Sequence, residues 1–190
     1  MHPPARVLET VHAGTLGVWL GVLVMTGAGA AVVFPEMRSL DPRLPDFAAY
    51  GGEHWLIAGG RVAQRLFTVS DIAQLGLFCV FVATFTAMVL GRALAPRWRE
   101  FRLALALLLL GVLAYRFGVL GPRMASDLGE YWSAARAGDG ETAARAKAAF
   151  DADHPLGSRL IGASAALVAL SLIASLVSLG RASPALREGE

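Results

Sequence analysis

Two oppositely charged side chains interrupt long apolar runs of this sequence. Asp71 lies in the run Leu66–Leu90, and Arg116 lies in the run from Leu103 to Gly121. A charge in hydrocarbon is costly, so it usually faces other helices, has a partner, and marks a function or a structural contact. Each charge lies about five residues, or about 7 Å of helix, from the same expected end of its run. We therefore predict that Asp71 and Arg116 form an ion pair.

Further polar side chains gather near this end of the predicted spans. Gln74 shares a helix face with Asp71, and Arg123 follows Arg116 by two helical turns. His154 leads into the last apolar run. Two interpretations stay open, a structural lock and a pocket for a ligand. If a ligand binds, the excess of arginine favours an anionic group, such as a lipid headgroup or a small carboxylate.

The elements that must position these residues are membrane-spanning helices. Only 17% of the 190 residues are charged and 55% are hydrophobic, whereas about 25% of a soluble domain is charged. A helix of about 20 apolar residues crosses the hydrocarbon. The sequence predicts one all-α domain over residues 1–190, an antiparallel four-helix transmembrane bundle with spans at about 10–34, 66–90, 103–121 and 157–180. The third span requires that Arg116 be tolerated, and three spans are the alternative.

The connections on one side of the predicted bundle are long. Residues 35–45 read as a loop, and residues 46–65 as an interfacial segment. Residues 126–137 and 140–150 are predicted as short extramembrane helices, because Gly138-Asp139-Gly140 is a turn signal between two stretches of helix-favouring residues.

Basic residues set the predicted orientation in a cell (inner) membrane. Seven of them lie in about 32 residues of the two termini and the link between the second and third spans: Arg6, Arg92, Arg97, Arg99, Arg102, Arg181 and Arg187. The two remaining loops hold eight in about 68 residues, with many acids. Both termini are therefore predicted to be cytoplasmic. An alternative stays open in which the first run is a signal peptide, cleaved near Ala28-Gly29-Ala30.

Small residues suggest how two of the spans pack. Gly14, Gly17 and Gly21 recur at helical spacing in the first span, a pattern that lets helices approach closely. A comparable row in the last span contains Ser158, Gly162 and Ala166. The two rows are predicted to face each other, and the alternative is that one of them mediates oligomerisation.

Several classes of chemistry lack support in the sequence. We find no catalytic motif for hydrolases, metalloproteases or nucleotide-binding enzymes, and no run of basic residues that suggests nucleic-acid binding. Cys79 is the only cysteine, which excludes an intramolecular disulfide and CxxC chemistry. No cofactor is expected. His54 and His154 are the only plausible couple for a haem or metal.

Short motifs give a family resemblance across most of the chain. They are Trp19-Leu20-Gly21 followed by a small-residue run into Phe34-Pro35, the stretch AGGRVAQRLF at residues 58–67, and Phe150 with His154 before the last apolar run. With the size and the four spans, the chain resembles the transmembrane protein 205-like family, a membrane domain of unknown function. The resemblance implies an integral membrane protein, with links elsewhere to metal or drug tolerance. The family's histidine usually precedes a serine and an asparagine in the last span, and this chain has no asparagine there.

Three functional hypotheses follow from these observations. The first is a non-enzymatic membrane protein, in contact with membrane lipids, whose polar site near the outer end binds or moves a small anionic or lipid ligand. The second is a structural subunit of a larger membrane complex or a homo-oligomer. The third is a haem- or metal-binding membrane protein.

Overall fold

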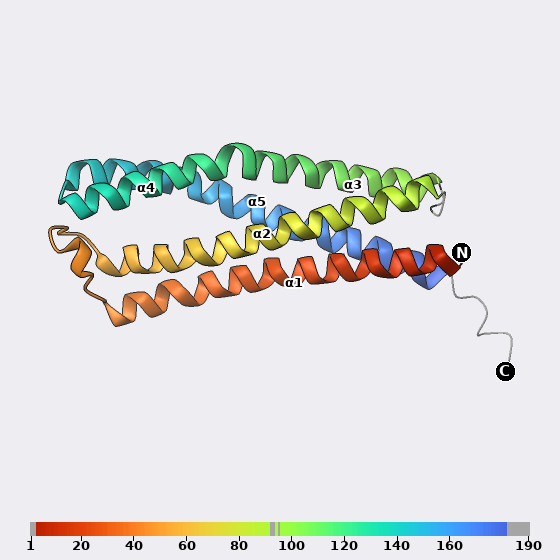
Figure 1. Ribbon diagram of the computed structural model, residues 1–190, viewed down its shortest axis with the longest axis horizontal. Helices are drawn as coiled ribbons and strands as arrows, with labels where there is room; N and C mark the ends of the chain where they lie inside the picture. The colour runs from red at the N-terminus through yellow and green to blue at the C-terminus, as the bar shows by residue number, and fades with distance from the viewer. Residues whose placement is uncertain (1–2, 92–93, 95, 182–190) are drawn as a thin grey trace. The chain divides into compact units, whose positions relative to one another are not determined.

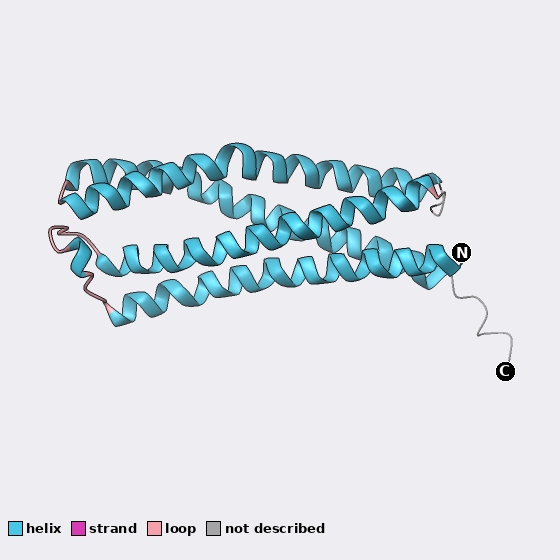
Figure 2. Ribbon diagram, in the orientation of Figure 1, coloured by secondary structure: helices cyan, strands magenta, loops and turns pink. Residues whose placement is uncertain are grey.

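The computed structural model describes residues 3–91, 94 and 96–181. Arg92 and Arg187, two of the residues that set the predicted orientation, lie outside the described residues, as do the side chains of Arg97 and Arg181. The described chain is all-α and contains no strand (Figure 2). In chain order (Figure 1), its elements are α1 (Pro3–Leu40), η1 (Pro45–Phe47), α2 (His54–Leu90), α3 (Pro96–Tyr115), the π turn η2 (Arg116–Leu120), α4 (Gly121–Ala137) and α5 (Gly140–Arg181).

Four helical segments of the described chain are long and apolar enough to cross a membrane. They are Ala5–Leu40, His54–Leu90, Trp98–Ala137 and Gly140–Gly180. The prediction of four spans and an all-α helical bundle is confirmed, and the protein is an integral membrane protein. At 36 to 41 residues, each segment is about 54–62 Å long, against a hydrocarbon thickness of about 30 Å. Each helix therefore extends beyond the apolar layer.

The helix boundaries differ from the predicted ones because helix continues through the polar stretches. α1 passes through Pro35 and ends at Leu40, so most of the predicted loop is helical. α2 begins at His54, inside the predicted interfacial segment. The two predicted short helices exist, but they are extensions of the long helices: α4 follows α3 through η2, and α5 runs on through Pro155.

The chain divides into two compact units, each containing parts of several helices. Unit 1 comprises residues 1–24, 71–111 and 164–190, and unit 2 comprises residues 25–70 and 112–163. Unit 1 contains a small apolar cluster of Phe85, Met88 and Leu94. Unit 2 contains the connections between α1 and α2 and between α4 and α5, and it has a larger buried cluster.

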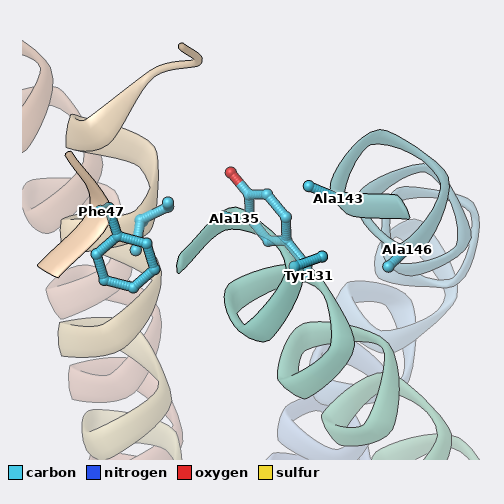
Figure 3. Packing of buried hydrophobic residues seen from close by; sticks show 7 residues of the cluster. Phe47, Tyr131, Ala135, Ala143 and Ala146 are labelled. Carbon is cyan, nitrogen blue, oxygen red and sulfur yellow. The ribbon is translucent and has the colours of Figure 1, made fainter. Parts of the chain in front are cut away.

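The buried cluster of unit 2 joins η1, α2, α4 and α5. Figure 3 shows Phe47 of η1, Tyr131 and Ala135 of α4, and Ala143 and Ala146 of α5 in this cluster. The tyrosine hydroxyls of Tyr50 and Tyr131 lie 3.3 Å apart. Small alanines on α4 and α5 let the large rings fill the space between helices, which is how soluble proteins build close-packed cores. This packing fixes the first part of α2 and the last part of α4.

The turn between α4 and α5 is built as the sequence predicts. Gly138 has a φ of 76°, and its N–H bonds to the end of α4, which is the left-handed helix cap that favours glycine. Asp139 precedes α5, and its Oδ1 accepts a hydrogen bond of 3.0 Å from the Thr142 N–H. This capping bond from Thr142 holds the pKa of Asp139 below its usual value.

The cap makes the start of α5 sensitive to acid. Because the folded pKa of Asp139 is lowered, its contribution to stability is present at neutral pH and is lost as the pH falls through that lowered pKa. NMR titration of the Asp139 carboxyl carbon in detergent-solubilised protein should give a midpoint below that of a peptide covering residues 136–145. An equal midpoint in protein and peptide would contradict the cap.

The π turn η2 requires glycine at the residue after its last position. The Gly121 N–H bonds to the Arg116 carbonyl, five residues back, and a Cβ added at Gly121 would lie 2.9 Å from that oxygen. Such a contact forces the backbone to shift. A Cβ added at Gly118, inside the same turn, would meet no atom within 4 Å.

Gly121→Ala should therefore destabilise the protein by about 1–3 kcal/mol, the usual cost of overpacking. Gly118→Ala, the matched control, should be neutral or stabilising because alanine favours helix over glycine. Unfolding in detergent, followed by circular dichroism, measures both. Equal effects of the two substitutions would show that the close approach at Gly121 does not constrain the turn.

Candidate functional site

The predicted polar residues occupy different units. Asp71 and Gln74 lie on α2 in unit 1, where Gln74 Nε2 donates a hydrogen bond of 3.3 Å to Asp71 Oδ1 and Gln74 is buried. This is the shared helix face that the spacing predicts. Arg116 lies in unit 2, is buried, and has its guanidinium carbon 4.7 Å from the ring centre of Phe117. The ion pair between Asp71 and Arg116 stays a prediction.

Arg123 has a partner that sequence spacing did not assign to it. Its guanidinium forms two hydrogen bonds, 2.5 and 2.6 Å long, with the carboxylate of Asp153 on α5. The side chain of Arg123 is half exposed. His154 is also exposed, and its ring lies 5.5 Å from that of Phe150. The structure thus places Arg123 in a contact between α4 and α5 and His154 on the surface.

His54 performs a structural role. Its Nδ1 accepts a hydrogen bond of 2.9 Å from the Leu44 N–H, so its Nε2 carries the ring proton and donates it to the Tyr50 carbonyl at 3.0 Å. A metal at either nitrogen would have to displace one of these bonds. No group of three or more His, Cys, Asp or Glu side chains in the described residues could hold a metal ion.

The glycine row of α1 faces outward. A Cβ added at Gly14, Gly17 or Gly21 would meet nothing within 4 Å, and the same holds for Gly162 of α5. These positions therefore mark no close approach of another helix in the described chain. Ser158 and Ala166 are likewise exposed. Contact of either row with a second chain stays a prediction.

The described part of unit 2 contains a pocket lined by arginine side chains. We call it the arginine pocket. Its volume is about 300 Å³, and its walls come from η1, α2 and α4 through Phe47, Arg61, Gln64, Arg65, Gly129, Trp132, Ser133 and Arg136. The α2 residues Arg61, Gln64 and Arg65 stand at positions i, i+3 and i+4 and so share one helix face. The α4 residues share a face in the same way, at positions i, i+3, i+4 and i+7.

No acidic side chain among the described lining residues balances the positive charge of the arginine pocket. Three guanidinium groups line the pocket. Arg61 and Arg65 form no ion pair with any residue that the structure describes. Arg136 lies over the ring of Phe47, with its guanidinium carbon 5.2 Å from the ring centre. Arginine stays protonated at any physiological pH, so the pocket attracts anions.

Gln64 and Ser133 add neutral hydrogen-bonding groups beside the cations. An arginine side chain offers five N–H donors in a planar fork that matches carboxylate and phosphate oxygens. Trp132 and Phe47 supply apolar walls next to these donors. The arrangement suits a ligand with an anionic group and an adjoining apolar part.

A second polar centre, in unit 1, is fully buried and was not predicted from the sequence. We call it the Arg102 centre. Arg102 Nη1 donates a hydrogen bond of 3.0 Å to Glu9 Oε2, and its Nη2 donates one of 2.9 Å to Ser175 Oγ. Glu9 Oε1 also lies 2.9 Å from Nη1 but accepts no hydrogen bond, so that second contact is electrostatic. The centre links α1, α3 and α5.

His12 lies one turn after Glu9 on α1 and is also buried. The hydroxyl of Thr84 donates its only proton to a backbone carbonyl of α2, that of Val80 or Phe81. The bond of 2.7 Å between His12 Nδ1 and Thr84 Oγ1 is therefore donated by the histidine. The His12 ring also stacks on Phe81.

The sequence places Arg102 in the basic link between the second and third spans. At that position no ion-pair partner is predicted for it. Charge counting treats such an arginine as exposed, whereas this side chain is only 3% exposed. The available signal was the acid Glu9 among apolar residues of the first helix. Glu9 and Arg102 are 93 residues apart, so no local spacing rule pairs them.

Removing one partner of the Arg102 centre should be costly. Glu9→Met or Arg102→Met leaves a buried charge without its counter-charge, a loss of about 3–5 kcal/mol. Joint replacement by Glu9→Met and Arg102→Met should cost less than the two single changes added together, because no lone charge is left. Arg99→Gln, at an exposed position of the same helix, is the control.

Unfolding free energies in detergent measure this coupling through the double-mutant cycle. Additive effects of the two single substitutions would show that Glu9 and Arg102 do not act as a pair.

Comparisons of the chain with protein-family models, with curated proteins and with solved structures find no match.

Proposed function

We propose that this four-span membrane protein binds a small anionic group, a phosphate or a carboxylate, in the arginine pocket. The observation that carries the proposal is the set of three guanidinium groups, Arg61, Arg65 and Arg136, around a cavity with no acidic lining residue among those described. Anionic ligands are the natural complement of such a site, because arginine presents paired N–H donors to two oxygens at once.

The rest of unit 2 supports a preformed pocket. Phe47 is fully buried in the cluster that joins η1 to α4 and α5. The pair Arg123–Asp153 joins α4 to α5. The arginine side chains are thus presented by a packed framework, and ordering costs on binding are confined to the side chains themselves.

The sequence also predicted an anion site, but around different residues. Asp71, Gln74, Arg116, Arg123 and His154 were its candidates. Arg123 is paired with Asp153, and neither Arg123 nor His154 lines the arginine pocket, so neither is proposed to bind the anion. The family resemblance stays a prediction, and the alternatives of a complex subunit or a haem protein draw no support from the pocket.

Inorganic phosphate is the simplest probe of the proposal. Added to purified protein in a neutral detergent at about 100 times its Kd, phosphate should raise the free energy of unfolding by about 2.7 kcal/mol. The double variant Arg61→Gln with Arg65→Gln should lose this increment. Ionic strength is held constant with chloride, since screening alone changes the stability of exposed charges.

Arg159→Gln is the matched control, because Arg159 is an exposed arginine of unit 2 outside the pocket lining. It should keep the full phosphate effect. An equal response of wild type and the double variant, or no response of wild type to phosphate, would overturn the proposal.

A further inference from the structure

We infer that the anion held in the arginine pocket is the phosphate of an anionic phospholipid. This inference rests on the proposed function and narrows it to a ligand class. It depends on three features of unit 2: the position of the arginines along α2, the apolar residues that continue their helix face, and the size of the cavity.

The arginines of α2 lie at the edge of its apolar run. Arg65 directly precedes Leu66, where the apolar run of this helix begins, and Arg61 lies one turn earlier. Interfacial arginines and tryptophans sit at the level of lipid headgroups, and Trp132 lines the same cavity. A phosphate bound here is at the depth that a phospholipid phosphate already occupies.

The face of α2 that carries the arginines continues as apolar, exposed surface. Arg61, Arg65 and Val69 are successive positions four residues apart, so they lie along one side of the helix. Val69 is 68% exposed in the chain. A ligand whose phosphate contacts the two arginines can therefore lay an acyl chain along the helix toward Val69, about 6 Å from Arg65 along the axis.

The cavity is large enough for a lipid headgroup but too small for a whole lipid. Its volume of about 300 Å³ is at the low end for small-molecule sites. A phosphate and a glycerol unit can enter, and the acyl chains must remain outside on the helix face. Three lining arginines also repel a cationic headgroup such as choline, which favours an anionic lipid such as phosphatidylglycerol over zwitterionic phosphatidylcholine.

The test compares three probes on delipidated protein in a neutral detergent. Phosphatidylglycerol and phosphatidylcholine with identical acyl chains report headgroup selectivity, and glycerol 3-phosphate is a phosphate probe without chains. Native mass spectrometry gives the affinity for each lipid, and isothermal titration gives that for glycerol 3-phosphate. We expect phosphatidylglycerol to bind about tenfold or more tightly than either of the other probes. The arginines repel the cationic choline group of phosphatidylcholine, and glycerol 3-phosphate has no acyl chain to cover the exposed face of α2.

Four variants locate the binding. Arg61→Gln with Arg65→Gln should remove the preference for phosphatidylglycerol, whereas Arg61→Lys with Arg65→Lys should weaken binding but keep the preference. Val69→Ser should weaken lipid binding and leave that of glycerol 3-phosphate unchanged. Val32→Ser is its control, because Val32 is similarly exposed on α1 and lines no part of the pocket. Circular dichroism confirms that each variant is folded.

The outcomes separate the two proposals. If glycerol 3-phosphate binds as tightly as phosphatidylglycerol and this binding needs Arg61 and Arg65, the lipid inference is wrong and anion binding stands. If both lipids bind equally, with or without the arginines, and glycerol 3-phosphate does not bind, both proposals are wrong. An effect of Val32→Ser as large as that of Val69→Ser would overturn the assigned path of the acyl chain.

Discussion

Compensation of charge in an apolar chain is the constraint on which this structure depends. A guanidinium group cannot lose its proton at physiological pH, so each buried arginine must find an anion or polar acceptors. Arg102 finds both, in Glu9 and Ser175, and thereby ties α1, α3 and α5 together in unit 1. The half-exposed Arg123 is also paired, with Asp153. The arginines of the pocket lack such a counter-charge among the described residues, and that contrast makes them candidates for an external anion.

The two units satisfy this constraint by different means. In unit 1 the polar groups are enclosed: Glu9, His12, Thr84, Arg102 and Ser175 are all buried. Polar groups that are removed from solvent must form hydrogen bonds or ion pairs with one another. These contacts define which helix faces meet. In unit 2 a cluster of rings and alanines defines the helix packing instead, and the arginine, glutamine and serine side chains that line the pocket remain accessible. Accessible cations on a packed framework suit reversible binding, whereas enclosed ion pairs suit structural specificity.

Composition and run length were enough to predict the all-α class and the four spans, because about twenty predominantly apolar residues in a row leave few alternatives to a membrane helix. They could not set the helix ends, since Pro35 and Pro155 are accommodated within longer helices. Local spacing correctly put Gln74 beside Asp71. It could not find Glu9–Arg102 or Arg123–Asp153, because partners on different helices are chosen by helix rotation, which one sequence does not encode in any local pattern. The arginine pocket was missed for a related reason: Arg136 and Arg61 approach only after η1, α2 and α4 have packed.

The position of the pocket along α2 indicates which anion its arginines bind. A cation at the start of an apolar run has two favourable environments, water and the phosphate layer of a membrane. Isolated arginines at such positions serve as anchors and need no pocket. Here Arg61 and Arg65 instead line a cavity together with Arg136, Gln64 and Ser133, so their charges converge on one volume. Because these charges converge, they repel one another, and a bound phosphate reduces this repulsion. The acyl chains of the lipid cover the exposed side chain of Val69. The energetic advantage of binding thus comes from the same feature that makes the empty pocket unfavourable.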